Sequence, residues 1–308
     1  MRHIYSIAGG KGGTGKSFVT ASLGILLAQL GKKVLLVDLD LGAANLHTFL
    51  DVKNPETGLD EYLDKKVSSL DEVTTSTAIS NLSFISSGRC SLEIANIHYA
   101  QKLKIIRAIH KLDYDYILLD LGSGTHFNTI DFFLASNQGF LITALEPVSI
   151  ENMFRFLQSL YLRKIRHLIK EYGVSTIFQY HINRFKNLRV TSPYHLIEFF
   201  KKYDERIGKE LENHFVNLRL YLILNQFRNG FDVNFGSKLA QVCNKHFYYS
   251  YDFAGNITFD TKVSEAILAN EIFIQKYPYT KTAQDLKRIV KRVFYQVSKH
   301  SNSISKAS

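Results

Sequence analysis

A glycine-rich segment with two lysines constrains the fold of this chain more than any other feature. Residues 9–17 read Gly-Gly-Lys-Gly-Gly-Thr-Gly-Lys-Ser, directly after the apolar run Ile4–Ala8 and before a helical pattern over Ser17–Leu30. The segment matches G-x-x-x-x-G-K-[ST] in the strand–loop–helix context that this motif requires. Backbone N–H groups in such a loop close around phosphates at a helix N-terminus. We therefore expect a nucleotide site in which Lys16 reaches the β- and γ-phosphates and Ser17 binds Mg²⁺.

Short apolar runs alternate with helical patterns along the rest of the chain. The runs are Val34–Val37, Leu82–Ile85, Tyr116–Leu119, Gly139–Thr143 and Leu220–Leu224, and the helical patterns lie near Ala100–Lys111, Ser149–Leu162 and Ser237–Lys245. Continuous apolar runs are typical of buried parallel strands, and strands that alternate with helices imply right-handed crossovers. The sequence therefore predicts an α/β fold with a doubly wound, mostly parallel sheet.

The pattern changes between about Phe154 and Asn217, where aromatic and basic residues are frequent. Helical periodicity over Phe156–Lys170 and Leu196–Leu211 makes this segment too long for one crossover helix. We predict a helical insertion at about 155–217 within a single domain of residues 1–299. The polar tail, residues 300–308, is expected to be disordered.

The positive charge of the chain is concentrated in two segments. Of a formal net charge of +10, residues 155–210 carry +7 and residues 281–308 carry +6, so an anionic partner is expected at one of them. Cys90 and Cys243 lie far apart without a C-x-x-C motif, which disfavours a zinc knuckle or an iron–sulfur carrier. No signal peptide precedes the glycine-rich segment and no apolar stretch approaches the length of a membrane span, so we expect a cytoplasmic protein.

Lys11 narrows the class of loop. K-G-G-x-G-K-[ST] is the variant phosphate-binding loop of the MinD/ParA ATPases, and the chain resembles that family over most of its length. The resemblance implies ATP and Mg²⁺ as cofactors and an ATP-dependent homodimer in which Lys11 crosses to the phosphates of the partner subunit. A lysine that acts only within its own subunit is the alternative. The resemblance also implies the following nucleotide-binding residues: Gly10, Lys11, Gly12, Gly13, Thr14, Gly15, Lys16, Ser17, Phe18, Asn45 and Asn225.

Two carboxylates follow the second apolar run, at the strand edge where open α/β sheets bind their ligands. The segment is similar to the first switch of the family. That resemblance implies that Asp40 orients or deprotonates the attacking water, that Asp38 supports the Mg²⁺ shell and that Asn45 contacts the nucleotide region. Asp40 then joins Lys11 and Lys16 as a catalytic residue, while two solvated acids on a loop are the alternative.

Asp120 closes another apolar run, at the position of the family's Walker B carboxylate. The resemblance therefore implies a metal site made of Ser17, Asp38 and Asp120. The following residues, 121–125, read Leu-Gly-Ser-Gly-Thr and replace the D-x-P-x-G of many relatives, so the second switch is altered. Asn225 ends a run and resembles the family residue that reads adenine, while a simple turn-forming Asn is the alternative.

Residues 120–135 and 145–152 look most like the FlhG branch of the family, whose members help to set flagellar number and placement. This resemblance implies a switch whose ATP-bound dimer binds an unidentified protein partner or activator. The alternative is a ParA-type partition ATPase that binds nonspecific DNA through the basic segment 155–210. Contacts to phosphates would make that binding fall steeply with salt.

The last helical pattern leaves two roles open. Apolar residues recur on one face, at Leu286, Ile289, Val290, Val293, Phe294 and Val297, and Lys287, Arg288, Lys291 and Arg292 lie around them. Such a helix can lie on an anionic membrane surface, which would place the protein peripherally on the inner face of the membrane through residues 282–299. Alternatively, the stripe packs on the sheet as the final helix of the fold.

Overall fold

The computed structural model describes residues 2–52, 55, 57–87, 97–172, 193–247 and 250–304, with the backbone alone at 193–196 and 295–304. Its centre is an eight-stranded sheet of order β3-β4-β2-β5-β1-β6-β7-β8. The strands are β1 (His3–Ala8), β2 (Val34–Leu39), β3 (Thr75–Ser76), β4 (Leu82–Ile85), β5 (Tyr116–Leu121), β6 (Gln138–Thr143), β7 (Arg219–Phe227) and β8 (Ser250–Thr258). The short β3 pairs antiparallel with β4, and the other strand pairs are parallel.

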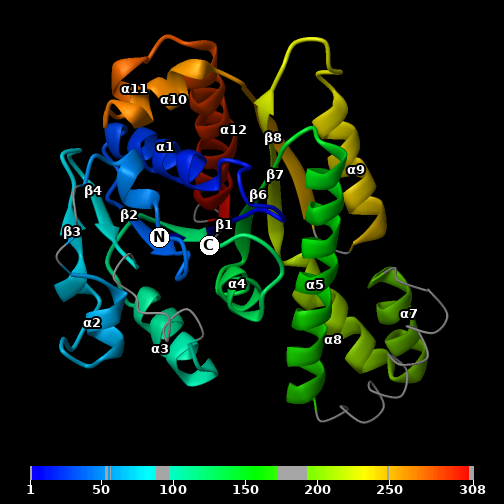
Figure 1. Ribbon diagram of the computed structural model, residues 1–308. Helices are drawn as coiled ribbons and strands as arrows, with labels where there is room; N and C mark the ends of the chain where they lie inside the picture. The colour runs from blue at the N-terminus through cyan, green and yellow to red at the C-terminus, as the bar shows by residue number, and fades with distance from the viewer. Residues whose placement is uncertain are drawn as a thin grey trace.

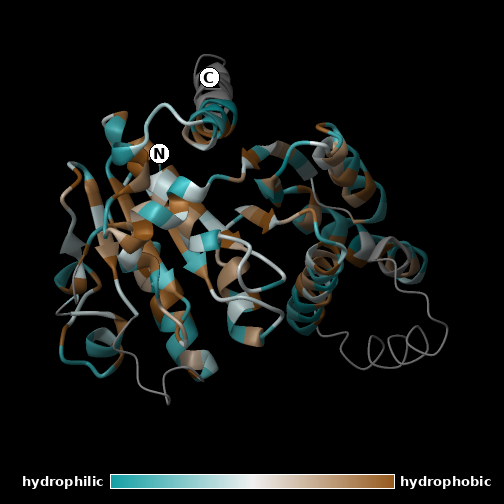
Figure 2. Cartoon of the chain, turned by 45° about the horizontal axis from the view of Figure 1, so that its top comes forward, coloured by the Kyte–Doolittle hydropathy of each residue, from teal (hydrophilic) through white to brown (hydrophobic). Residues whose placement is uncertain are grey.

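Helices cover both faces of this sheet (Figure 1). They are α1 (Lys16–Gln29), α2 (Leu59–Leu63), α3 (Tyr99–Ile109), α4 (Phe127–Phe133), α5 (Pro147–Glu171), α7 (Pro193–Tyr203), α8 (Glu205–Val216), α9 (Phe235–His246), α10 (Thr261–Leu268), α11 (Phe273–Lys276) and α12 (Lys281–Ile304), with 3₁₀ turns η1 (Leu46–Phe49) and η2 (Asp71–Val73). One hydrophobic core joins the sheet to α3, α4, α5 and α9, and the other joins it to α1, α11 and α12. Hydrophobic residues accordingly follow the strands through the middle of the molecule (Figure 2). The prediction of a doubly wound, mostly parallel α/β fold is confirmed.

The segment between β6 and β7 differs in detail from the prediction. The helical patterns that begin near Ser149 and Phe156 form one helix, α5, which is the crossover helix itself. The single pattern over Leu196–Leu211 is divided into α7 and α8 at Asp204, because the Asp204 carboxylate caps α8 by accepting backbone N–H groups. Of the insertion predicted at 155–217, the structure thus describes the C-terminal half of α5 together with α7 and α8, and residues 173–192 lie outside the described residues.

The apolar stripe of α12 belongs to the core. Its members from Leu286 to Phe294 are nearly inaccessible to solvent, and the Phe294 ring lies edge-on to Tyr5 of β1 at a centroid distance of 4.9 Å. The alternative of a final core helix is therefore confirmed, and the stripe is not available to a membrane. The side chain of Val297 lies outside the described residues. The helix itself continues to Ile304, into the tail predicted to be disordered, since no glycine or proline interrupts it; residues 305–308 lie outside the described residues.

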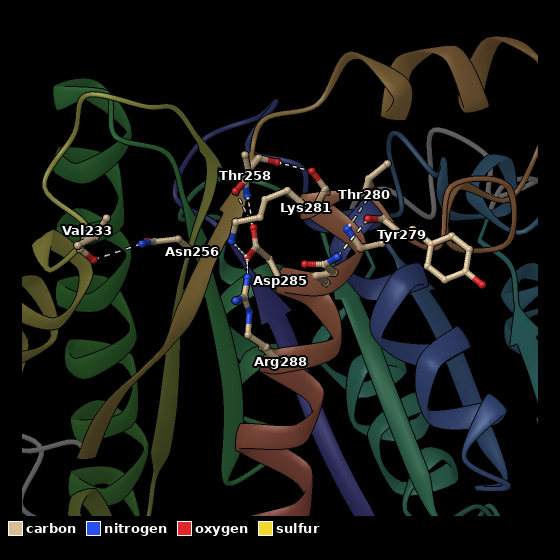
Figure 3. A network of polar contacts seen from close by, with 11 residues as sticks. Val233, Asn256, Thr258, Tyr279, Thr280, Lys281, Asp285 and Arg288 are labelled. Atoms are coloured by element: carbon tan, nitrogen blue, oxygen red, sulfur yellow. Dashed lines mark hydrogen bonds and ion pairs between the residues drawn. The ribbon is translucent and has the colours of Figure 1, made fainter.

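A polar network fixes the start of α12 to the end of β8 (Figure 3). The Asp285 Oδ2 atom accepts hydrogen bonds from the Thr258 backbone N–H at 3.0 Å and from its hydroxyl at 2.6 Å. Asp285 Oδ1 accepts from Lys281 Nζ at 2.9 Å and from the Arg288 guanidinium. These contacts satisfy a carboxylate that is only 5% exposed and attach α12 to the same strand edge that carries the candidate site. Among the described residues, no helix combines the length and the apolar character that crossing a membrane requires.

Candidate functional site

The glycine-rich loop connects β1 to α1, as its sequence predicts. Gly13 and Gly15 have φ angles of 79° and 84°, in the left-handed region that favours glycine. Gly10 is required for another reason, because a Cβ atom there would lie 2.2 Å from the backbone of Asn152 in α5. The loop therefore needs glycine at positions 13 and 15 for their backbone conformation, and at position 10 for close packing against α5.

Lys16 points into the sheet edge and is only 8% exposed. Burial lowers the pKa of Lys16, and the neighbouring Asp120 and Asp40 carboxylates oppose this shift. Asp120, at the end of β5, is 1% exposed and accepts a hydrogen bond from the Thr20 hydroxyl at 2.9 Å. Burial raises the pKa of Asp120, while hydrogen bonds from the Ser17 and Thr20 side chains and the charge of Lys16 act in the opposite direction. Asp120, Lys16 and Ser17 thus meet beneath the loop.

Asp38 lies opposite Asp120 in the register of β2 and β5. Its two carboxylate oxygens accept the backbone N–H groups of Asp40 at 3.0 Å and of Leu46 at 3.2 Å. Burial raises the pKa of Asp38, and the nearby Asp120 raises it further. Asp38 therefore holds both ends of the loop that follows β2, in addition to the metal role that the resemblance implies.

Asp40 lies at a half-buried position beside the segment that follows β5. A Cβ atom on Gly122 would lie 3.1 Å from Asp40 Oδ1, so the segments that follow β2 and β5 are in close contact. A cavity of about 380 Å³ opens beside Asp40 and is lined by Gly122, Ser123, His126 and Thr129 among others. Asp40 consequently faces a space that can hold a water molecule.

Two predicted residues lie apart from this centre. Asn45 is exposed within the loop that Asp38 holds, directly before Leu46, and its carbonyl accepts from the Thr48 hydroxyl at 2.7 Å. The Phe18 ring is 6% exposed and packs against Phe49 and Phe273. Only the backbone of Phe18, at the start of α1, is thus free to contribute to phosphate binding.

Lys11 lies on the outer surface of the loop, with a side chain 43% exposed. Its Nζ atom contacts Glu146 Oε2 at 3.0 Å, and Glu146 also accepts from the Ser149 hydroxyl at 3.4 Å. The Lys11 contact lowers the pKa of Glu146. Glu146 directly precedes α5 and was not singled out as a site residue; the Glu-Pro dipeptide before a helix was the signal available.

Two consecutive residues at the end of β7 contact the loop from its other side. The Asn225 side-chain amide donates to the Thr14 carbonyl at 2.8 Å, and that of Gln226 donates to the Gly13 carbonyl at 2.9 Å. Asn225 was predicted to be near the nucleotide, whereas Gln226 was missed because only its position after Asn225 marked it.

The site has oxygen atoms suited to Mg²⁺, which prefers hard oxygen ligands and keeps several waters. Ser17, Asp38 and Asp120 supply them beneath the loop. Within the described part of the chain, no three His, Cys, Asp or Glu side chains are grouped to hold a metal ion. The protein would therefore share such an ion with the phosphates of a nucleotide.

Both the sequence and the fold of the chain are similar to those of known proteins. Residues 5–273 match the model of the CobQ/CobB/MinD/ParA nucleotide binding domain. The septum site-determining protein MinD of Helicobacter pylori is 31% identical over 156 residues, 50% of this chain and 58% of that protein. The antiactivator FleN of Pseudomonas aeruginosa is 26% identical over 159 residues, 51% of this chain and 56% of that protein. The chain thus spans little more than half the length of these curated relatives.

Solved structures share the fold. MinD of Pyrococcus horikoshii, complexed with Mg-ADP, superposes with a TM-score of 0.60 at 21% identity and covers 95% of this chain and 96% of its own. A plasmid partition protein of Borrelia burgdorferi bound to AMPPNP gives a TM-score of 0.62 at 15% identity, with 96% and 100% covered. Because the family model spans most of the chain and its loop is formed as described, the chain belongs to the CobQ/CobB/MinD/ParA nucleotide-binding family.

Proposed function

We propose that the protein is a Mg²⁺-dependent ATPase that forms a homodimer when ATP is bound. The placement of the two loop lysines is the observation that carries this proposal. Lys16 is buried beside Asp120, where it can serve only the nucleotide of its own subunit. Lys11 points outward from the same loop and is 43% exposed, so it can reach the phosphates of a second subunit. The same loop therefore provides one cation, Lys16, for the nucleotide of its own subunit and another, Lys11, for the nucleotide of the second subunit.

The residues divide the work of phosphoryl transfer, which depends mainly on positioning and on charge neutralisation. The loop N–H groups and Lys16 bind the phosphates, and Ser17, Asp38 and Asp120 would hold the metal. Mg²⁺, when bound, neutralises charge on the phosphates. Asp40 orients or deprotonates the attacking water in the cavity beside Gly122.

Lys11 must leave Glu146 before it can reach a partner subunit. Both side chains are about half exposed, at 43% and 60%. An ion pair at this level of exposure is screened by solvent and weak, so ATP can displace Glu146 from Lys11 at little cost. The pair therefore holds Lys11 in place without preventing the exchange.

The role in the cell that we favour is FlhG-like, in the spatial or numerical regulation of flagella or of another polar structure, through an unidentified protein partner or activator. Residues 120–135 and 145–152 carry the resemblance, and both flank the loop. The Gly124 N–H donates to the Gly9 carbonyl at 3.3 Å, and Glu146 contacts Lys11. The similarity to antiactivator FleN supports this direction. Deleting the gene in its host and counting flagella per cell tests this role, and an unchanged number and position would contradict it.

A ParA-type role in partition is the second candidate. It is favoured by the basic C-terminal half of α5, which carries Lys164, Arg166 and Lys170, and by the fold shared with the Borrelia burgdorferi partition protein. Nonspecific DNA binding in ATP that falls steeply between 50 and 200 mM salt would support this role. Fluorescence anisotropy on labelled duplex DNA measures it.

Peripheral contact with an anionic membrane stays within the proposal, but its basis changes. The apolar stripe of α12 is buried, so only the exposed basic face with Lys287, Arg288, Lys291 and Arg292 remains. Co-sedimentation with anionic liposomes, in ATP and in ADP, tests this contact. Pelleting in neither state would rule it out.

Two variants test the switch itself. Lys16→Ala should lose ATP binding, because no other buried cation faces Asp120 in the described structure. Asp40→Ala should keep ATP binding and accumulate the dimer, because binding groups remain while the water-directing carboxylate is gone. Isothermal titration calorimetry measures ATP binding, and light scattering after size exclusion measures the dimer. An Asp40→Ala protein that stays monomeric in saturating ATP would refute the switch.

A further inference from the structure

The end of β7 holds the glycine-rich loop through two adjacent side chains. In a regular strand, successive side chains point to opposite faces of the sheet. Asn225 and Gln226 nevertheless reach the same loop, because Gln226 has a φ of 57° and the pairing with β8 shifts register between Leu224 and Phe227. This irregularity turns both amides toward the carbonyls of Gly13 and Thr14.

These two hydrogen bonds fix the direction of two backbone N–H groups. The described peptide bonds are all trans, and in a trans peptide the C=O and N–H groups point in opposite directions. Holding the Gly13 carbonyl toward β7 therefore turns the Thr14 N–H away from β7. In the same way, holding the Thr14 carbonyl toward β7 turns the Gly15 N–H away from β7.

The loop needs such an external restraint. Gly13 and Gly15 both lie in the left-handed region, and glycine has more backbone freedom than any other residue. Asn225 is tightly placed, since a Cβ atom on Gly15 would lie 2.2 Å from its amide nitrogen. With one of its two N–H donors committed to the Thr14 carbonyl, Asn225 keeps one N–H and its Oδ1 atom for an adenine.

We propose that Asn225 and Gln226 are positioning residues that hold the Thr14 and Gly15 N–H groups toward the phosphates, so that β7 contributes to phosphate affinity and not only to reading the base. This inference rests on the proposed binding of ATP. Of the two residues, Gln226 is the better one to test, because its side chain is exposed and its amide contacts the loop. A change there separates an effect on phosphate binding from an effect on base recognition.

The chemistry of the residue at 226 gives three different expectations. Gln226→Ala removes one donor, and loss of a hydrogen bond of this kind weakens binding by about fivefold. Gln226→Glu keeps the shape but sets a carboxylate against the Gly13 carbonyl, so binding should weaken more than in Gln226→Ala. Gln226→Lys restores a donor and should recover most of the affinity. A role in packing alone would not follow this order.

The test compares ligands with and without a base. Displacement of a fluorescent ADP analogue gives the Kd of Mg·ATP and of inorganic tripolyphosphate for each variant and for the control Gln241→Ala, an exposed change on α9. We expect both ligands to weaken by the same factor, about fivefold, in Gln226→Ala, with recovery in Gln226→Lys and no change in the control.

Three results would overturn the inference alone. They are a loss confined to ATP with tripolyphosphate unaffected, a Gln226→Lys protein as weak as Gln226→Glu, and failure of tripolyphosphate to compete in the unchanged chain. Failure of the unchanged chain to bind ATP would instead overturn the proposed function, and this inference with it.

Discussion

Replacing Asp131 by asparagine should destabilise the protein strongly, because this carboxylate joins three helices. Asp131 of α4 is 6% exposed. It accepts from Lys102 Nζ of α3 at 2.5 Å and from Arg163 of α5 at 2.7 Å from Nε and 2.9 Å from Nη2. The Lys102 side chain is only 6% exposed, whereas that of Arg163 is 21% exposed. Asp131→Asn keeps the shape and leaves the Lys102 charge buried without its partner.

The expected loss follows from burial. Removing one partner of a buried ion pair costs about 3–5 kcal/mol, because the other charge stays desolvated. Arg163 can still turn toward water, so we place the loss at the lower end, about 3 kcal/mol of unfolding free energy at pH 7. A matched control is Asp113→Asn, since its pair with Lys33 has side chains 99% and 55% exposed. Breaking that pair should cost less than about 0.5 kcal/mol.

The difference in unfolding free energy between the unchanged protein and Asp131→Asn should depend on pH, because the Asp131 carboxylate titrates. Burial alone would raise the pKa of Asp131, but hydrogen bonds from Arg163 and Lys102 outweigh it and hold the pKa below its usual value. A group with a lowered pKa in the folded state stabilises it above the unfolded pKa, about 4, and this contribution is lost as pH falls through the folded pKa. The unfolding free energies of the unchanged protein and of Asp131→Asn should therefore approach each other at low pH.

Urea unfolding at pH 7 and at lower pH measures these effects. Lys102→Met added to Asp131→Asn should recover part of the stability, because the buried charge is then gone. A loss below 1 kcal/mol at pH 7, or a penalty that persists unchanged in acid, would refute the reasoning.

Three further changes test other contacts. Ile289→Asp in the α12 stripe should give insoluble or unfolded protein, since Ile289 is 1% exposed. The control Lys287→Glu, on the exposed face of the same helix, should stay soluble. An Ile289→Asp protein that is soluble and folded by circular dichroism would contradict the placement of this stripe in the core. Gly10→Ala should abolish nucleotide binding in calorimetry, because its Cβ atom would collide with the α5 backbone at 2.2 Å, and unchanged binding would argue against that packing. Glu146→Gln should lower the dimer dissociation constant in ATP by at most about fivefold, since it frees Lys11 from an exposed ion pair. Sedimentation analysis measures this constant. An increase in the constant would instead make Glu146 part of the dimer contact.

The strands that sequence analysis located are the buried ones. Central parallel strands are apolar on both faces, so β2 and β5 stand out as continuous runs. β8 was missed because it is an edge strand with Asp252, Gly255 and Asn256 within it. The two-residue β3 has no pattern that could mark it. The division between α7 and α8 did have a signal, Asp204 at the capping position, but helical periodicity on both sides concealed it.

The candidate site was predictable to the extent that it is local in sequence. The loop and Lys16 follow from one contiguous segment, and Asp120 follows from the end of a buried run. Glu146 and Gln226 come from segments far along the chain, and only the parallel sheet brings them to the loop. α12 shows the same limit, since one amphipathic pattern fits a membrane surface and a core equally well, and packing against β1 and β8 decides between them.

α5 contacts three separate parts of the molecule, the glycine-rich loop, α4 and α8. Its first turns contact the loop, where the backbone of Asn152 lies against Gly10, and Glu146, which directly precedes the helix, contacts Lys11. Its middle is joined by Arg163 to Asp131 of α4, the helix that follows residues 121–125. Its 25 residues extend for about 37 Å, and α8 packs on its far half, where the Tyr161 and Phe215 rings stack at 4.4 Å. One continuous helix therefore contacts the loop, α4 and α8.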